Sequence, residues 1–98
     1  MFTLMAILRA KPGYENKVKA ALQTVGNYVR AHEPGTTSFF VTQSADDPCL
    51  FVTYERFVDR AAMEQHNNGE GSQCFFAEAG EFLDGPATLV TGPEIFEK

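Results

Sequence analysis

Apolar residues form three short runs along the chain, and each run has the length of a single β-strand. The runs are residues 2–10, Thr36–Gln43 and Cys49–Phe57. The first ends at the turn signal Lys11-Pro12-Gly13, and a turn over 44–48 joins the other two. Short apolar runs bounded by turn residues are typical of strands. The pattern therefore predicts one separate strand followed by an antiparallel hairpin.

Between these runs the apolar spacing changes to that of an amphipathic helix. Over 14–33 the apolar positions are separated by four, three and four residues, at Val18, Leu22, Val25 and Val29. Pro34-Gly35 ends this helix, because proline disfavours helical geometry in the residue before it and glycine allows a sharp exit.

A second helical region follows the hairpin. Asp59 is a good N-cap for a short helix over Arg60–His66, which Asn67-Asn68-Gly69 interrupts. A further helix is predicted from Glu70 to Leu83, and a last short strand over Ala87–Thr91.

The element order is β-α-β-β-α-β, which predicts a single α+β domain over residues 1–98 with the ferredoxin-like arrangement. Right-handed crossovers place the first and third strands in the centre of the sheet. Helices then cover only one face, yet Leu4–Leu8, Phe39–Val41 and Leu50–Val52 are apolar on both faces. A half-exposed sheet should alternate apolar and polar residues, so we expect a second copy of the chain to cover the other face.

Composition narrows the classes of partner. The 98 residues carry a net charge of −5 and no run of Lys or Arg, which disfavours nucleic acid and anionic membranes. Two cysteines and two histidines without paired spacing disfavour a structural zinc site. The apolar N-terminus lacks a basic leader and is too short to span a bilayer, so a cytoplasmic protein is expected.

His66 and Glu55 are the candidate catalytic residues. A histidine at a helix end can serve as a general base near neutral pH, or can simply interact favourably with the helix dipole. Glutamate is disfavoured in a central strand, so Glu55 either faces a pocket beside His66 or pairs with Arg56 or Arg9. Tyr54 points to the opposite face from Glu55. His32 reads as a cap at the helix exit, and Arg9 as a solvated side chain.

Nine phenylalanines supply the material for an aromatic-lined cavity. Phe75, Phe76 and Phe82 lie on the last helix, and Phe39, Phe40, Phe51 and Phe57 lie on strands. From this set we predict pocket walls formed by Phe40, Phe51, Phe57, Phe75 and Phe76. No phosphate-binding loop or dinucleotide fingerprint occurs, so no cofactor is expected.

Several short motifs, in order and spacing, resemble the antibiotic biosynthesis monooxygenase family. They are Lys11-Pro12-Gly13-Tyr14-Glu15, His32-Glu33-Pro34-Gly35, Asp47-Pro48, the segment from Tyr54 to Ala62, His66, Gly85-Pro86 and Gly92-Pro93. The resemblance implies a dimeric α+β barrel in which two ferredoxin-like sheets pack face to face. It also implies one of several chemistries: cofactor-independent oxidation of quinols or anthrones, haem degradation, or processing of a phosphorylated signal.

The haem-degrading branch is disfavoured, because the Asn, Trp and His expected there align with about Leu8, His66 and Phe76 or Ala77. The oxygenase and signal-processing members commonly share the Glu55 and His66 pattern. We therefore expect a homodimeric, cofactor-independent monooxygenase acting on a small aromatic substrate, with His66 as base. A non-catalytic binding dimer, and an isomerase or degradative enzyme for a small oxygenated metabolite, stay open as alternatives. A phosphorylated substrate would need Arg9, Lys11 or Arg56 in the pocket.

Overall fold

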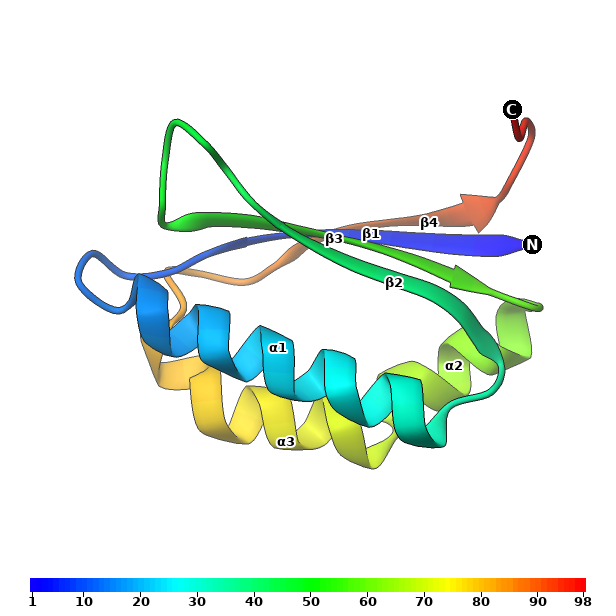
Figure 1. Cartoon of the computed structure of the whole chain (residues 1–98), viewed down its shortest axis with the longest axis horizontal. Coiled ribbons are helices and arrows are strands. Elements are labelled where there is room, and N and C mark those ends of the chain that lie inside the picture. Colours follow the sequence, from blue (N-terminus) through cyan, green and yellow to red (C-terminus); the bar gives the residue numbers. More distant parts are fainter.

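A computed structural model describes all 98 residues as a four-stranded antiparallel sheet with the helices packed on one face (Figure 1). The elements in chain order are β1 Phe2–Arg9, α1 Glu15–His32, β2 Thr36–Gln43, β3 Leu50–Phe57, α2 Arg60–Asn68, α3 Glu70–Ala79, the 3₁₀ turn η1 Gly80–Phe82 and β4 Thr88–Pro93. None of the helices has the length and apolar character needed to cross a membrane.

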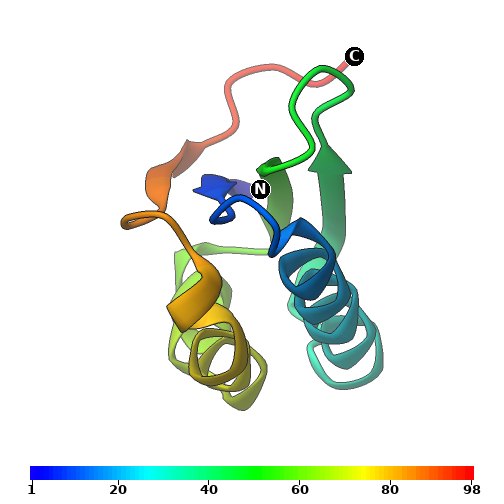
Figure 2. The ribbon, with the colours of Figure 1, turned by 90° about the vertical axis from the view of Figure 1, so that its left-hand side faces the viewer.

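The strand order is β2-β3-β1-β4, with the first and third strands in the centre. This confirms the ferredoxin-like prediction. In the register of the central strands, Leu4 pairs with Glu55 and Ile7 with Val52. Figure 2 shows α1 and α3 side by side beneath the sheet, while the C-terminal tail passes over its other side.

Three element ends differ from the prediction by two residues or more, and the other differences are of one residue. α2 continues to Asn68, and the chain is extended only at Gly69 before α3 begins. α3 ends at Ala79 and the chain tightens into η1, so the predicted helix over 70–83 is shorter. β4 runs to Pro93, two residues beyond the prediction. Proline is tolerated there because β4 is an edge strand, with no further strand to accept a hydrogen bond.

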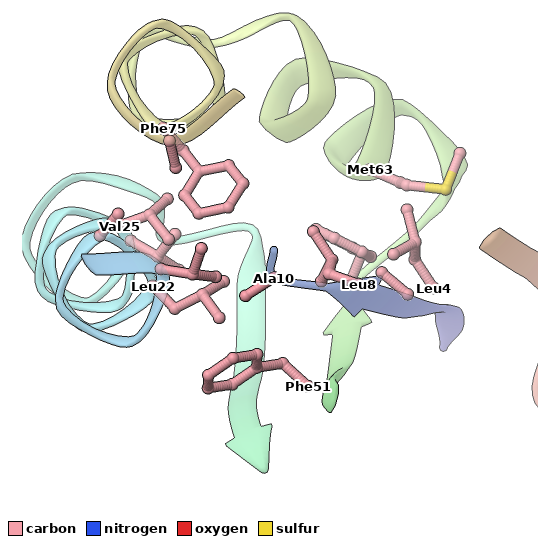
Figure 3. Close-up of a cluster of buried hydrophobic side chains, with 14 of the residues drawn as sticks. Leu4, Leu8, Ala10, Leu22, Val25, Phe51, Met63 and Phe75 are labelled. Atoms are coloured by element: carbon pink, nitrogen blue, oxygen red, sulfur yellow. The ribbon is translucent and has the colours of Figure 1, made fainter. Parts of the chain in front are cut away.

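The core lies between the sheet and the helices. On β1 the residues Leu4, Ala6 and Leu8 are buried, and they alternate with exposed side chains of the other face. The helical stripe predicted from Val18 to Val29 is buried against them. In Figure 3, Phe75 of α3 points between the helices toward Val25. Every second residue of the strands and the apolar face of α1 thus pack against each other in one apolar layer.

The outer face of the sheet is apolar at its centre and carries no helix. One row across the strands contains Phe40, Tyr54, Met5 and Val90, as the strand register places them. Phe40 is 60% exposed and Val90 is 64% exposed. A contiguous apolar surface of this kind is typical of an interaction face.

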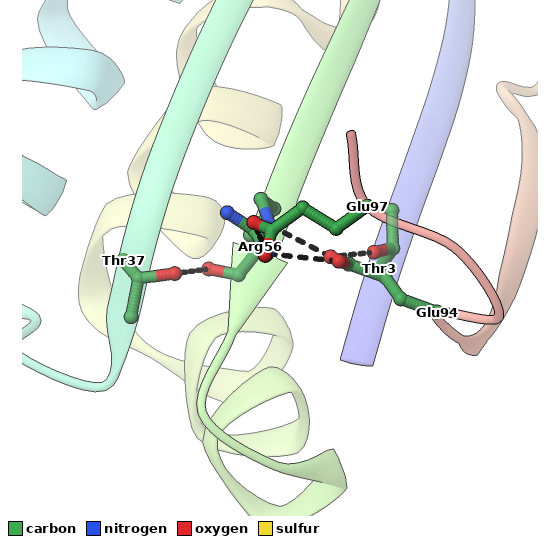
Figure 4. A network of polar contacts seen from close by, with 5 residues as sticks. All are labelled: Thr3, Thr37, Arg56, Glu94 and Glu97. Atoms are coloured by element: carbon green, nitrogen blue, oxygen red, sulfur yellow. Dashed lines mark hydrogen bonds and ion pairs between the residues drawn. The ribbon is translucent and has the colours of Figure 1, made fainter. Parts of the chain in front are cut away.

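One end of the outer face is closed by the C-terminal tail. Arg56 donates from Nε and Nη2 to both carboxylate oxygens of Glu94, at 2.7 and 2.8 Å, and from Nη2 to Glu97 at 2.9 Å (Figure 4). The Thr3 hydroxyl donates to Glu94 at 2.8 Å. This network holds the tail against β1 and β3, and it leaves Ile95 and Phe96 projecting into solvent.

Candidate active site

A cavity of about 260 Å³ lies between the helix-facing side of the sheet and the three helices. Most of its wall is apolar, with contributions from Leu4, Ala6, Leu22, Val25, Phe39 and Leu89. The polar part of its wall consists of Thr53, Glu55, His66, Asn67 and Ser72. An apolar cavity with a few convergent polar groups is the usual form of a small-molecule site.

His66 lies on the same face of α2 as the buried apolar residues of that helix. Asp59 caps the helix by accepting a hydrogen bond from the Ala62 N–H at 2.8 Å. Ala62, Met63 and His66 then fall on one buried face, and His66 is only 6% exposed. The sequence therefore places an ionisable ring on the apolar side of a helix.

The turn after α1 packs tightly against this helix. A Cβ atom added at Gly35 would lie 2.9 Å from the Cβ of Ala62, so only glycine lets the two segments approach this closely. The close approach brings Glu33, the C-cap residue of α1, to the imidazole of His66.

His66 lies between two carboxylates. Its Nδ1 is 2.6 Å from Glu33 Oε1, and its Nε2 is 2.9 Å from Glu55 Oε1. The side chains of His66 and Glu55 are 7% and 6% exposed, and that of Glu33 is 15% exposed. The three residues come from α2, β3 and the end of α1, so the tertiary fold assembles the cluster.

The two contacts of the ring differ in kind. Nδ1 and Glu33 Oε1 are 2.6 Å apart in a hydrogen bond, and because an unprotonated nitrogen and a carboxylate oxygen are both acceptors, this bond needs a hydrogen on Nδ1. Nε2 lies 2.9 Å from Glu55 Oε1 without hydrogen-bond alignment. In the neutral ring the hydrogen is therefore on Nδ1, and Nε2 is free to accept a proton.

Burial and the two carboxylates have opposite effects on the pKa of His66. Burial lowers the pKa of the imidazole, but the hydrogen bonds and charges of Glu55 and Glu33 outweigh burial, and the pKa lies above its ordinary value of 6.5. The two carboxylates therefore make His66 a stronger base than a free imidazole.

Further polar groups hold the cluster in place. The Thr53 hydroxyl donates to Glu55 Oε2 at 2.6 Å, and the Thr36 hydroxyl donates to Glu33 Oε1 at 3.2 Å. Ser72 donates to the His66 carbonyl at 2.8 Å, with its Oγ 3.5 Å from Nε2. Glu55 Oε1 is buried and close to Nε2, but it has no donor aligned with it. This oxygen is the least satisfied polar atom of the cavity wall.

The structure brings His66 and Glu55 together, with Phe75 and Phe76 in the same cavity wall. The alternative pairing of Glu55 with Arg56 or Arg9 is wrong, because Arg56 pairs with Glu94 and Arg9 pairs with Asp47. Tyr54 lies on the opposite face from Glu55, as the strand alternation predicts. His32 is an exposed residue at the end of α1, and Glu33 rather than His32 is the cap.

Three of the predicted pocket phenylalanines do not line the cavity. Phe40 points to the outer face, because side chains alternate along β2 and Phe39 is the one that faces the helices. Phe51 and Phe57 are fully buried toward the two ends of β3, where core packing closes around them. Between them, Thr53 and Glu55 face the cavity. Phe57 nevertheless contacts the imidazole, with ring centroids 5.5 Å apart.

Sequence reasoning did not select Glu33, Phe39 and Ser72 as site residues. Glu33 carries a weak signal, since a carboxylate directly before Pro34-Gly35 lies at the negative end of the helix dipole, where an acidic side chain is unfavourable. Phe39 belonged to the wider aromatic set, and only the parity of β2 separates it from Phe40. Nothing in the sequence indicates that Ser72 approaches His66.

No Arg or Lys side chain lines the cavity. Arg9 lies at the end of β1 with Asp47, Lys11 donates to the Glu81 carbonyl, and Arg56 lies on the outer face. A phosphorylated ligand would meet no Arg or Lys there, and the imidazole of His66 is flanked by two carboxylates. No group of three or more His, Cys, Asp and Glu side chains is arranged to hold a metal ion.

Known proteins are similar to this chain in sequence and in fold. A Bacillus subtilis (strain 168) protein named "Putative monooxygenase YcnE" is 29% identical over 90 residues, covering 92% of this chain and 94% of that protein. The structure described as "Putative antibiotic biosynthesis monooxygenase from Nitrosomonas europaea" matches with a TM-score of 0.89 at 24% identity, covering 98% of this chain and all of that one (100%).

A second Nitrosomonas europaea structure, "NE2512 protein of unknown function", matches with a TM-score of 0.86 at 27% identity, covering 99% of this chain and 91% of that one. The family model described as antibiotic biosynthesis monooxygenase matches residues 1–78, a range that contains Glu33, Glu55 and His66. The protein belongs to the antibiotic biosynthesis monooxygenase family.

Proposed function

We propose that the protein is a cofactor-independent monooxygenase that oxidises a small aromatic or quinol-type substrate with dioxygen. The observation that carries this proposal is the buried His66–Glu55 pair on the wall of an otherwise apolar cavity. Such a pair can remove a proton from a bound ring, and the apolar wall keeps competing water away from the resulting anion.

In this mechanism the His66–Glu55 pair is the base. Glu55 Oε1 has no aligned donor, so a substrate hydroxyl can donate to it, and the arriving proton is shared with His66 Nε2 over 2.9 Å. Deprotonation makes the ring electron-rich enough to transfer electrons to dioxygen. One oxygen atom enters the substrate and the other leaves as water. The substrate supplies all four electrons, two on insertion of the oxygen atom and two as the hydroxylated ring is oxidised to the quinone or ketone level.

The cavity limits the class of substrate. Its volume of about 260 Å³ is at the small end for ligand sites, and its wall contains no Arg or Lys. Both features favour a small, uncharged ring system. They speak against a phosphorylated metabolite, and so against that form of the isomerase or degradative alternative.

Oxygen uptake with a panel of hydroquinones and anthrones tests the proposal. We expect uptake by the wild type, and a loss of about 10²-fold or more in His66→Gln and Glu55→Gln, which removes general-base catalysis. Glu64→Gln is the matched control, because Glu64 is exposed on the same helix as His66 and its one ion pair is with Arg60, at 3.7 Å. Uptake that is equal in the wild type and His66→Gln would exclude this base.

Binding without turnover is the competing outcome. It would appear as a rise in the melting temperature with the same aromatics and no oxygen uptake in the wild type. The protein would then be a ligand-binding member of the family.

We also propose that the functional unit is a homodimer in which a second copy covers the outer face of the sheet. The apolar row through Phe40, Tyr54 and Met5 supports this, since water contact with such a surface is unfavourable. Ile7→Lys places a charge on that face, whereas Ala77→Lys places the same charge on the exposed side of α3. Sedimentation should show dissociation for Ile7→Lys only, and a monomeric wild type would contradict the proposal.

A further inference from the structure

A second hollow lies on the other side of the His66 cluster. It is a groove of about 520 Å³ between α1 and β2, and polar side chains such as Asn27, Arg30 and Thr37 line it and are exposed to solvent. Phe39 lines both this groove and the apolar cavity and so separates them. Glu33 lines the groove and is absent from the cavity wall.

A continuous chain of contacts links the two hollows. Glu55 on the cavity wall is 2.9 Å from Nε2 of His66, and Nδ1 of the same ring is 2.6 Å from Glu33 on the groove wall. Imidazole can accept a proton at one nitrogen and release a proton from the other. The geometry thus provides a path for a proton that does not pass through the substrate cavity.

We propose that Glu33 is a positioning residue that holds the Nδ1 proton of His66 and connects the buried His66–Glu55 pair to water in the groove. The inference rests on the proposed function for its role in turnover. Its physical content, a carboxylate that governs protonation of His66 from the groove side, can be tested without a substrate.

Only protons move in this relay, and no group changes its oxidation state. A proton that arrives on Glu55 passes to Nε2, the Nδ1 proton passes to Glu33, and Glu33 releases one proton to groove water. When the reduced oxygen needs a proton to form water, the same steps run in reverse. The cavity can then exchange protons while a substrate fills it.

The charged groups that act on the His66 ring are few. Glu33 at the end of α1 and Glu55 on β3 both raise its pKa. α3 contributes only the Ser72 hydroxyl, and β2 and β3 contribute the rings of Phe39 and Phe57. A change in the titration of His66 on removal of the Glu33 charge therefore reports on this one contact.

Nuclear magnetic resonance of the His66 ring in full-length protein is the deciding experiment, with Glu33→Gln compared with the wild type and the control Glu64→Gln. Glu33→Gln keeps the size of the side chain and removes its charge. We expect the pKa of His66 to fall by roughly one unit or more in Glu33→Gln and to stay unchanged in Glu64→Gln. An unchanged pKa in Glu33→Gln would overturn the proposal.

Water exchange of the Nδ1 proton separates a relay from simple shielding. Compared at equal fractions of protonated His66, a relay carboxylate predicts slower exchange in Glu33→Gln, because the acceptor that passes the proton on is lost. A carboxylate that only shields the ring predicts faster exchange, which would also overturn the proposal. Glu33→Asp, which keeps the carboxylate, should restore part of the exchange rate.

Kinetics distinguish the failure of this inference from failure of the proposed function. If turnover is found, Glu33→Gln should lower kcat about tenfold and shift the pH profile with the pKa of His66, while KM stays constant because Glu33 does not line the cavity. Unchanged kcat and pH profile would overturn the relay and leave the monooxygenase proposal intact. If the wild type shows no turnover, the monooxygenase proposal fails and the resonance results still decide the role of Glu33.

Discussion

Glu55 and Arg56 are neighbours in β3, and their side chains lie on opposite faces of the sheet in two different polar networks. Glu55 joins His66 and Glu33 in a cluster whose side chains are 6–15% exposed. Arg56 joins Glu94 and Glu97 in a network whose side chains are 14–68% exposed. The two residues are consecutive in one strand, and they lie on different faces because side chains alternate along it.

The two networks differ in how completely their polar groups are satisfied. Glu94 receives hydrogen bonds from Arg56 and Thr3 and ties the C-terminal tail to the sheet. Glu55 is more deeply buried, yet its Oε1 lacks an aligned donor and faces an apolar cavity. A buried polar atom without a partner is costly, so Glu55 Oε1 contributes less to stability than Glu94 does. The outer network holds the C-terminal tail against the sheet, and the inner one leaves an acceptor open toward the cavity.

The largest expected contrast between the two faces concerns two phenylalanines. Phe57→Ala removes a fully buried ring that contacts His66, and should lower the free energy of unfolding by about 4 kcal/mol through the transfer and cavity costs. Phe40→Ala removes a 60% exposed ring and should cost less than about 1 kcal/mol in the monomer. Urea unfolding at low protein concentration measures both.

Protein concentration sharpens this comparison. If a second copy covers the outer face, the cost of Phe40→Ala should grow with concentration, because the dimer adds stability by mass action. The difference between the two losses in unfolding free energy then becomes smaller, but Phe57→Ala still causes the larger loss. If both variants lost the same unfolding free energy at low concentration, Phe40 would be as important to the fold of the monomer as the buried Phe57, and the comparison of a buried face with an exposed face would fail.

A smaller effect is expected from the two neighbouring residues themselves. Glu55→Gln leaves the His66 ring beside a neutral amide inside the core, and should cost about 2 kcal/mol near pH 6, where the imidazolium is present. Arg56→Gln should cost less, because its partners remain in contact with water. Thermal unfolding of both variants, with Glu64→Gln as control, decides the order. The reverse order would assign the larger stabilising role to the outer network.

The sequence predicted the fold well because the spacing of apolar residues determines which side of each element is buried. The apolar stripe from Val18 to Val29 and the three apolar strand runs can be buried together only if the helices pack on one face of the sheet. The strand order then follows from the handedness of the crossovers. The ends of α3 and β4 were less predictable, since they depend on how the chain turns at Gly80 and on the position of β4 at the sheet edge.

The site was predicted only in part, because its geometry is tertiary. His66 and Glu55 carry a local signal, an ionisable residue inside an apolar pattern. Glu33 is 33 positions from His66 in the sequence, and only packing of the turn at Gly35 on Ala62 joins them. Choosing Phe40 over Phe39 was an error of one residue, in a strand whose three central residues, Phe39 to Val41, are apolar on both faces.

The smallest effect, and the one that separates the two networks most cleanly, is the dependence of stability on pH. Glu94 has its pKa lowered from 4.5 to about 2, chiefly by the hydrogen bond from Arg56. Its contribution to stability is therefore present above about pH 4.5 and is lost as the pH falls toward 2. The pKa of His66 is raised, so its contribution is fully present below its ordinary value of 6.5 and is lost as the pH rises through the raised value.

The limb of a stability profile above pH 6.5 thus reports on the inner network. The acid limb reports on the outer network together with Asp47, whose pKa is lowered by the hydrogen bond from Arg9, so the change caused by a Glu94 variant isolates the outer network. Glu94→Gln should flatten the slope below pH 4.5 and leave the upper limb unchanged, and His66→Gln should do the reverse. Urea unfolding between pH 2 and 9 measures both slopes. If either variant altered both limbs, the networks would be coupled through β3, and opposite parity on one strand would not be enough to isolate them.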